Sequence, residues 1–252
     1  MPLRLAISKN IKQKRDGNMH EELINMPRTK RGRATLNNIL SAAAQVFYEK
    51  GYHAASINDI TRLAGVASGT FYTYFDSKYD LYKFLLLQCS HMIRKNLSKC
   101  IKKCKNRLEA EQEGMRAWLE FAMENQYMYH IIWESMYVDY SLFEDYYVTF
   151  QQAYKKGLDE AKKAGEIRED IDTEVLAYTL MGASNFLGLN WCLFKHDPSA
   201  VNHVTEQFMK IIKGEAFIQG AKPEEVPKDA GAPASKPKFR FNVTVDEPDG
   251  NE

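Results

Sequence analysis

The sequence between residues 68 and 74 reads SGTFYTY, a run in which hydroxyl-bearing side chains surround one phenylalanine. Serine, threonine and tyrosine hydroxyls bind phosphate oxygens, and threonine also contacts base edges in the major groove. Phe71 and Phe75 stand four residues apart and are expected to anchor the run in a core. The remaining residues then face outward, which indicates a surface for nucleic acid made of Ser68, Gly69, Thr70, Tyr72, Thr73 and Tyr74.

The elements that would position this run have the pattern of helices joined by a glycine turn. Apolar residues recur at helical spacing after a predicted N-cap at Thr35. A second helix would begin at Ser56 and bury Leu63, and Gly65 supplies the left-handed backbone that a tight turn needs. This helix-turn-helix arrangement would place the third helix, about residues 67–75, in the major groove.

The remainder of the chain has helical periodicity almost throughout. A fourth helix would start at Ser77 and continue to the lysine-rich run near Lys105. Further helices are expected at about residues 108–125, 126–136, 140–165, 172–194 and 198–213. Because no β-hairpin signal occurs, the predicted class is all-α, with a three-helix domain joined by a long helix to a C-terminal bundle that dimerises.

A long gapless pattern extends over the predicted helix-turn-helix. Its members are Phe47, Gly51, Tyr52, Ser56, Ile57, Ile60, the run from Ala64 to Tyr72, Tyr74, Phe75, Ser77, Lys78, Asp80 and Leu81. With these residues, positions 32–85 resemble the DNA-binding domain of TetR/AcrR-type transcriptional regulators, and they depart from it at Thr61, where alanine is common. The resemblance implies a two-domain all-α subunit, a homodimer, a palindromic operator, and release of DNA when a small effector binds.

The resemblance also implies which residues contact DNA. Carried over position by position, these contacts are Ser68, Gly69, Thr70, Tyr72, Thr73, Tyr74 and Lys78, with phosphate contacts from Thr35 and Ser56. Tyr72 has the alternative of packing against the first helix. The basic cluster from Arg28 to Arg33 could contact the minor groove or the DNA backbone, or could be a plain solvated tail.

The formal net charge of +1 conceals a strong asymmetry. The first 107 residues hold 20 Lys and Arg against 7 Asp and Glu, a net +13, and the rest carries −12. A basic front half favours a polyanionic partner. The predicted organisation is a flexible basic arm (1–33), a helix-turn-helix domain (34–80), a ligand-binding and dimerisation domain (81–214) and a proline-rich disordered tail (219–252).

Aromatic side chains are dense in the predicted second domain, more so than a small bundle core normally needs. One interpretation is a roomy apolar pocket for a small molecule, and the other is an ordinary aromatic core. We predict a pocket, mainly because the resemblance implies one. The residues expected to line it are Trp118, Phe121, Trp133, Met136, Tyr137, Phe143, Tyr147, Phe150 and Tyr178.

Three other features leave alternatives open. The helix over 172–194 carries small residues among apolar ones and fits, with the helix over 198–213, either a dimer interface or a buried intrachain role. The basic run from Arg94 to Arg107 is interpreted as a solvated helix end rather than a DNA contact. Cys100 and Cys104 share a helical face, where a redox switch is a minor alternative.

The composition and motifs disfavour several classes of protein. No apolar run reaches membrane-span length, and the four cysteines favour a reducing cytoplasm. Neither a metal set nor a nucleophile–base pair is recognisable, so we expect no cofactor and no enzyme. The leading hypothesis is a cytoplasmic, ligand-responsive, DNA-binding transcriptional regulator, with repression as the expected mode. The alternative is a helical interaction protein with vestigial or non-specific DNA binding.

Overall fold

The computed structural model describes residues 23–214 of the chain. Every regular element in this part is helical, so the all-α prediction is confirmed there. The predictions of an arm over residues 1–22 and of a tail over residues 219–252 lie outside the described residues. Within residues 23–214, no helix has both the length and the apolar character required to cross a membrane.

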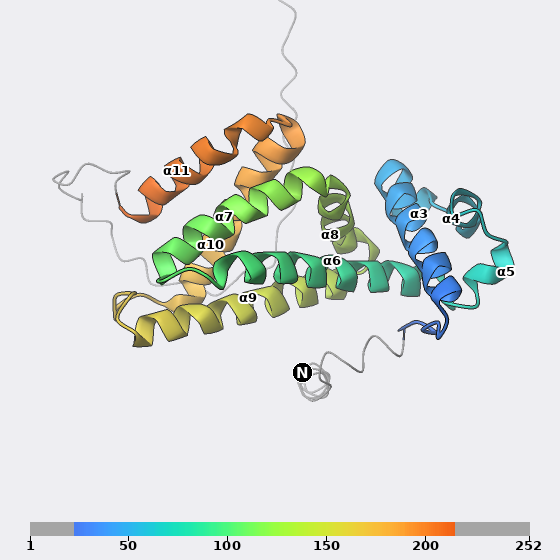
Figure 1. The fold of residues 1–252 in the computed structure, drawn as a ribbon, viewed down its shortest axis with the longest axis horizontal. Helices are drawn as coiled ribbons and strands as arrows, with labels where there is room; N and C mark the ends of the chain where they lie inside the picture. The colour runs from blue at the N-terminus through green and yellow to red at the C-terminus, as the bar shows by residue number, and fades with distance from the viewer. Residues whose placement is uncertain (1–22, 215–252) are drawn as a thin grey trace, which may run out of the picture. The chain divides into compact units, whose positions relative to one another are not determined.

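The helix-turn-helix unit consists of α3 (Lys30–Ala54), α4 (Ile57–Leu63) and α5 (Ser68–Phe71) (Figure 1). The first helix begins earlier than predicted, because Thr29 and not Thr35 is its N-cap. The Thr29 hydroxyl accepts a hydrogen bond from the Gly32 N–H at 3.0 Å. Basic side chains with good helix propensity therefore extend the helix into a stretch that lacks apolar residues.

The third helix is shorter than predicted, since only Ser68–Phe71 is helical and residues 72–74 form a turn. Phe71 and Phe75 are fully buried, as expected. Leu63 is 48% exposed, so its predicted core position is wrong. The seven-residue α4 buries only a narrow face, which is occupied by Ile60 and Thr61.

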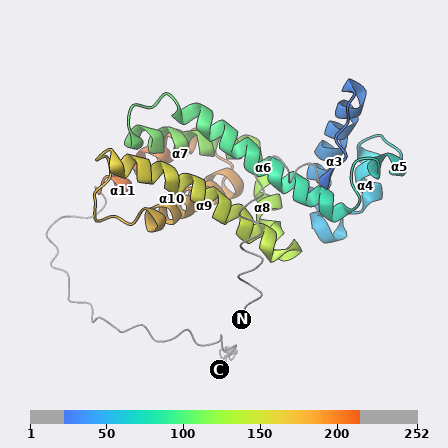
Figure 2. The same ribbon diagram turned by 90° about the horizontal axis from the view of Figure 1, so that it is seen from below.

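The rest of the described chain is a bundle whose helices agree with the predicted ranges to within a few residues. The elements are α6 (Lys78–Ile101), α7 (Arg107–Glu124), α8 (Gln126–Val138), α9 (Tyr140–Lys163), α10 (Thr173–Gly188) and α11 (Val201–Ile212). A π-helical turn, Leu189–Phe194, and a 3-10 turn, Pro198–Ala200, connect the last two helices. Figures 1 and 2 both show α6 running from the helix-turn-helix into the bundle, where it packs on α7, α8 and α9.

The helix-turn-helix and the near end of the bundle share one hydrophobic core. This cluster joins buried residues of α3, α4 and α5 to α6 from Leu81 to Ile93 and to Met128, Ile131 and Ile132 of α8. A second cluster holds α7, α10 and α11 together. Because the first core is continuous, the predicted domain boundary at residue 80 is not a break in packing, and the division of the chain there stays a prediction.

One polar contact between α3 and α8 depends on a glycine. Gly51 has φ 74° and ψ 162°, a region that is essentially restricted to glycine. The next residue, Tyr52, donates its N–H to Oε1 of Glu134. A β-carbon at Gly51 would lie 2.9 Å from the same oxygen.

We therefore expect Gly51→Ala to lower the free energy of unfolding by about 2–4 kcal/mol, through backbone strain and a displaced Glu134 carboxylate. Gly65→Ala is the matched control, because Gly65 also has a positive φ of 67° but nothing lies within 4 Å of its added β-carbon. That variant should lose only about 1–2 kcal/mol from strain. Urea denaturation followed by circular dichroism measures both, and equal losses would exclude a structural role for the Glu134 contact.

Candidate DNA-binding surface and ligand cavity

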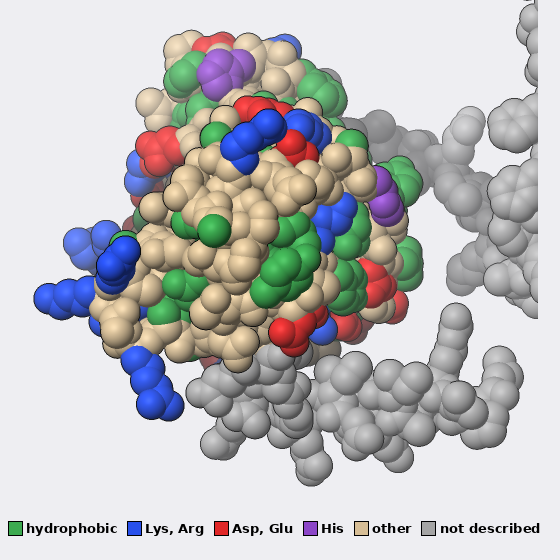
Figure 3. Space-filling view, turned by 90° about the vertical axis from the view of Figure 1, so that its right-hand side faces the viewer, with side chains coloured by type: hydrophobic (Ala, Val, Ile, Leu, Met, Phe, Trp, Pro, Cys, Tyr) green, Lys and Arg blue, Asp and Glu red, His purple; other side chains and the backbone are tan. Residues whose placement is uncertain are grey.

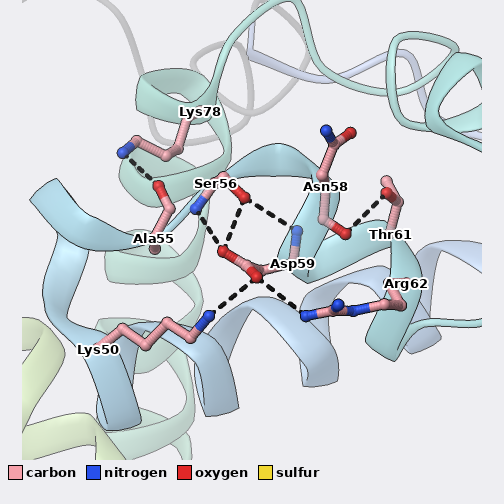
Figure 4. Close-up of polar contacts among 8 residues, drawn as sticks. All are labelled: Lys50, Ala55, Ser56, Asn58, Asp59, Thr61, Arg62 and Lys78. Carbon is pink, nitrogen blue, oxygen red and sulfur yellow. Dashed lines mark hydrogen bonds and ion pairs between the residues drawn. The ribbon is translucent and has the colours of Figure 1, made fainter.

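The start of α4 is fixed by a capping box. The Ser56 hydroxyl accepts from the Asp59 N–H, and both the hydroxyl and the N–H of Ser56 donate to Asp59 Oδ2, at 2.7 and 3.1 Å (Figure 4). Lys50 and Arg62 bind Asp59 Oδ1 at 2.8 and 3.2 Å. Hydrogen bonds from Lys50 and Ser56 hold the pKa of Asp59 well below its usual value. Since its hydroxyl proton is used in the cap, Ser56 would have to leave Asp59 to bind a phosphate.

The outward surface of α5 holds most of the residues predicted to contact DNA. Ser68, Gly69 and Thr73 are exposed, Tyr72 is 55% exposed and Thr70 is half-buried. A side chain added at Gly69 would meet nothing within 4 Å, so the backbone here is open to a partner. Figure 3 looks at the end of the molecule that carries this unit, where the surface is largely uncharged and Lys and Arg side chains project from one edge.

Tyr74 does not point outward as predicted. The side chain is buried, its hydroxyl donates to the Gly32 carbonyl at 3.1 Å, and its own carbonyl accepts from the Asn25 N–H at 2.9 Å. The reason is that the chain leaves the helix after Phe71, so the turn directs Tyr74 toward α3. Tyr74 therefore holds the start of α3 against α5.

Lys78 and Thr35 are also bonded inside the fold. The Lys78 ammonium donates to the carbonyls of Tyr52 and Ala55 at 2.6 and 2.7 Å and lies 4.4 Å from the centroid of the Tyr52 ring. Burial lowers the pKa of Lys78, and the Glu134 charge opposes this effect. The Thr35 hydroxyl donates to the Arg31 carbonyl at 3.1 Å. Both residues remain predicted DNA contacts, but these bonds make Lys78 first of all a link between α6 and the α3–α4 junction.

Sequence reasoning overlooked two polar side chains of α4. Asn58 is exposed and its amide oxygen accepts from the Ser68 hydroxyl at 3.2 Å, while Arg62 has a side chain that is 81% exposed. Their place just before the glycine turn could have indicated them. The basic cluster is likewise exposed, and Lys30, Arg31 and Arg33 are displayed on the first turn of α3 rather than on an arm.

A cavity of about 410 Å³ lies between α6, α7, α9 and α10, with Phe208 of α11 at its wall. Trp118, Tyr147 and Phe150 line it, as predicted. Six other predicted residues do not, namely Phe121, Trp133, Met136, Tyr137, Phe143 and Tyr178. Tyr137 and Tyr178 are 75% and 46% exposed, and the other four are half-buried, outside the cavity wall. Aromatic density predicted the region, but it does not distinguish the faces of a helix.

The cavity also has polar residues that the sequence prediction missed. Arg107 pairs through Nε with Glu111 Oε1 at 2.5 Å, and the Tyr154 hydroxyl donates to the other oxygen of the same carboxylate. Burial and the Glu111 charge raise the pKa of Tyr154 well above its usual value, so the phenol stays protonated as a donor. The spacing of Arg107 and Glu111, four residues apart, is the one signal that could have indicated the pair. Arg94 of α6 lies in the same wall.

Helix α6 connects this cavity to the DNA-facing unit. Ile93, Arg94 and Leu97 line the cavity in the second half of the helix. In the first half, the hydroxyls of Tyr79 and Tyr82 donate to Asp139 Oδ2 and to the Ile131 carbonyl, each at 2.6 Å. A shift of α6 at the cavity would therefore be transmitted to the α3–α4 junction through a helix held by polar bonds.

The arrangement of α3, α4 and α5, with one side of α5 facing outward, defines a helix-turn-helix protein. Residues 39–84 match the family model described as "Bacterial regulatory proteins, tetR family". Residues 39–84 therefore form a domain of the TetR family. Among the residues described, no group of His, Cys, Asp or Glu could hold a metal ion.

Curated relatives share the same domain. The HTH-type transcriptional activator FasR of Mycolicibacterium smegmatis is 28% identical over 100 residues, which are 40% of this chain and 46% of that protein. The HTH-type transcriptional repressor KstR2 of Mycobacterium tuberculosis is 24% identical over 72% of this chain and 92% of its own length. The match to the first of these relatives thus spans less than half of its length.

A solved structure shares the fold of both parts. The transcriptional regulator FadR from Bacillus subtilis, determined in complex with stearoyl-CoA, superposes with a TM-score of 0.58 at 19% identity. The alignment covers 69% of this chain and 97% of that one. At this identity the likeness establishes the arrangement of helices alone.

The bonds of Lys78 lead to a prediction about stability in the absence of DNA. Lys78→Met should lower the free energy of unfolding by roughly 2–3 kcal/mol, because two carbonyls at the α3–α4 junction lose their charged donor. Lys95→Met, an exposed lysine of the same helix, should change it by less than about 0.5 kcal/mol. Urea unfolding compares the two. A Lys78 variant of wild-type stability that has lost only DNA affinity would contradict the positioning role.

Proposed function

We propose that this protein is a DNA-binding transcriptional regulator that acts as a homodimer on a palindromic operator and is released by a small, largely apolar effector. The observation that carries the proposal is the connection of an exposed helix-turn-helix surface to a cavity through the single helix α6. Repression is the simplest mode for such a protein, because an effector that removes it from DNA relieves a block. The named relatives include an activator as well as a repressor.

On DNA, small side chains would make most of the base contacts. Thr70 and Thr73 offer methyl and hydroxyl groups, and the open backbone at Gly69 permits close approach. Tyr72 and the cations at the start of α3 would bind phosphates. Since α5 has no Arg, Lys, Asn or Gln, bidentate base contacts could come only from neighbours such as Asn58 and Arg62.

The proposed dimer would form through α10, α11 and the turn between them. These elements present large apolar side chains to solvent in the single chain, with Val175 63%, Phe186 65%, Phe194 72% and Ile211 59% exposed. Exposed apolar surface of this kind is typical of protein–protein interfaces. A dimer of helix-turn-helix subunits reads half-sites about 34–36 Å apart, so the interface would set the spacing of the operator.

The proposed effector would occupy the cavity beside α6. A volume of about 410 Å³ is in the usual range for small-molecule sites, and Trp118, Tyr147 and Phe150 supply apolar surface. The FadR structure with stearoyl-CoA supports a ligand with an apolar chain in this fold. Binding would favour a position of α6 that changes the separation of the two α5 helices in the dimer.

The DNA-reading assignment is tested with fragments that the wild-type protein enriches from a random pool. Tyr72→Phe, which removes only the hydroxyl, should weaken binding to enriched and random DNA alike by about fivefold. Replacing Thr70 and Thr73 by alanine should change the ranking of sites, with losses of about tenfold on the preferred fragment. Fluorescence anisotropy over a salt series provides the measurement.

Thr149→Ala, an exposed threonine of α9, is the control and should behave as wild type. If the double threonine variant ranks all fragments as the wild type does, the base-reading assignment is wrong. A wild-type protein that enriches no palindrome would instead support the alternative of a helical interaction protein with non-specific DNA binding.

The dimer makes a separate prediction. Phe186→Glu and Ile211→Glu, tested singly, should each shift the protein toward the monomer in sedimentation equilibrium and raise the dissociation constant by about a hundredfold, since each buries a charge at an apolar contact. Tyr137→Glu is the matched control, because Tyr137 is 75% exposed but belongs to α8. Unchanged association of both α10 and α11 variants would place the interface elsewhere.

A further inference from the structure

The charges in the cavity wall do not balance. Two guanidinium groups, Arg94 and Arg107, and one carboxylate, Glu111, are present. Glu111 is buried and bonded to Arg107 and to the Tyr154 hydroxyl, and the Arg107 guanidinium also lies 5.0 Å from the centroid of the Tyr154 ring. Arg107, Glu111 and Tyr154 therefore form a group with no net charge, and both oxygens of the Glu111 carboxylate are bonded. Arg94 is left as the charge in the cavity wall that no carboxylate neutralises.

Arg94 has no carboxylate partner within residues 23–214. The side chain is half-buried in the cavity wall, where its charge acts on the Tyr146 phenol. Burial raises the pKa of Tyr146 well above its usual value, against the opposing effect of Arg94, so this phenol is neutral near pH 7. A guanidinium that loses water beside apolar side chains is unfavourable unless an anion joins it.

The stretch of sequence that flanks Arg94 is also positively charged. Residues 91–107 contain seven Lys and Arg and no Asp or Glu. Helix α6 carries this stretch away from the DNA-facing unit, because Arg94 lies 16 residues after Lys78, about 24 Å along the helix axis. The basic run therefore lies at the bundle end of α6 instead of extending the α5 surface. Two of its members, Arg94 and Arg107, line the cavity, and the run would raise the local concentration of anions there.

The remaining wall is mostly apolar. Ile93 and Leu97 of α6, Trp118 of α7, Phe150 of α9 and Phe208 of α11 enclose the space next to Arg94. We propose that the effector is an amphipathic anion, whose carboxylate or phosphate head group pairs with Arg94 and whose apolar body fills the cavity. This inference rests on the proposed function and adds the chemical class of the effector and the residue that selects it.

The test compares ligands that differ only in the head group. Binding of octanoate, dodecanoate and hexadecanoate is measured through the intrinsic tryptophan fluorescence of the full-length protein, below the concentrations at which the ligands aggregate. The matching alkyl phosphates and the neutral alcohols of equal chain length are measured in the same way. At the best chain length, at least one anion should bind about tenfold or more tightly than the alcohol. Comparison of carboxylate with phosphate then distinguishes the two sources of the charge.

Variants identify the residue responsible. Arg94→Met should bring the anion-to-alcohol preference close to one while the alcohol binds as before, and Arg94→Lys should keep part of the preference. Lys99→Met, an exposed neighbour one turn away on α6, should retain most of it. Circular dichroism verifies that each variant is folded, and the Lys variant provides a second test if the Met variant is not.

The proposal is overturned if the wild-type protein binds no chain length of anion better than its alcohol, or if the folded Arg94→Met variant keeps the full preference. Failure of the regulator proposal has a different signature. In that case the anion would bind with the expected preference, but it would not change the affinity of the protein for its enriched DNA.

Discussion

The Lys78 ammonium bonds the long helix α6 to the helix-turn-helix unit. It is the first residue of α6, and it donates to two carbonyls at the junction of α3 and α4. A lysine here is costly to bury, as the lowered pKa indicates, and two short bonds to carbonyls offset that cost. The direction of α6 and the placement of the helix-turn-helix are therefore coupled, and a displacement of the start of α6 would act directly on the α3–α4 junction.

The same end of α6 is bonded to α8 on its other side. Tyr82 donates to the Ile131 carbonyl, and Glu134 accepts from the Tyr52 N–H across to α3. With the shared hydrophobic core, these bonds hold α3, α6 and α8 packed together. A ligand in the cavity would touch α6 at Ile93, which belongs to this core, and at Leu97, which packs against it. Ligand binding at this part of α6 would therefore act on the same packed helices that hold the helix-turn-helix.

Helical periodicity and capping residues were sufficient to predict the all-α class and the bounds of the bundle helices, because apolar spacing and caps act locally. Predictions from local patterns were wrong where contacts between residues distant in the sequence determine the structure. Thr29 starts α3 ahead of its apolar stripe, and the turn after Phe71 buries Tyr74 against Gly32. Three of the aromatic residues predicted to bind a ligand line the cavity, and their role stays a prediction. The contribution of α6 was not predicted, since nothing in the spacing of Arg94 reveals which helix faces it.

The α5 surface has little charge, whereas the cavity lies beside a strongly basic stretch of the chain. The α5 surface presents hydroxyls, a backbone opening and a tyrosine, so its recognition of DNA would depend on shape and on methyl contacts as much as on ionic bonds. The described cations at the start of α3, namely Arg28, Lys30, Arg31 and Arg33, would supply phosphate attraction, whereas the seven of residues 91–107 lie between the second half of α6 and the first residue of α7. Because Arg94 lies about 24 Å along α6 from Lys78, an anionic ligand there would act at a distance from the cations at the start of α3. Its effect on DNA would then have to pass through the helix rather than through direct competition for the same cations.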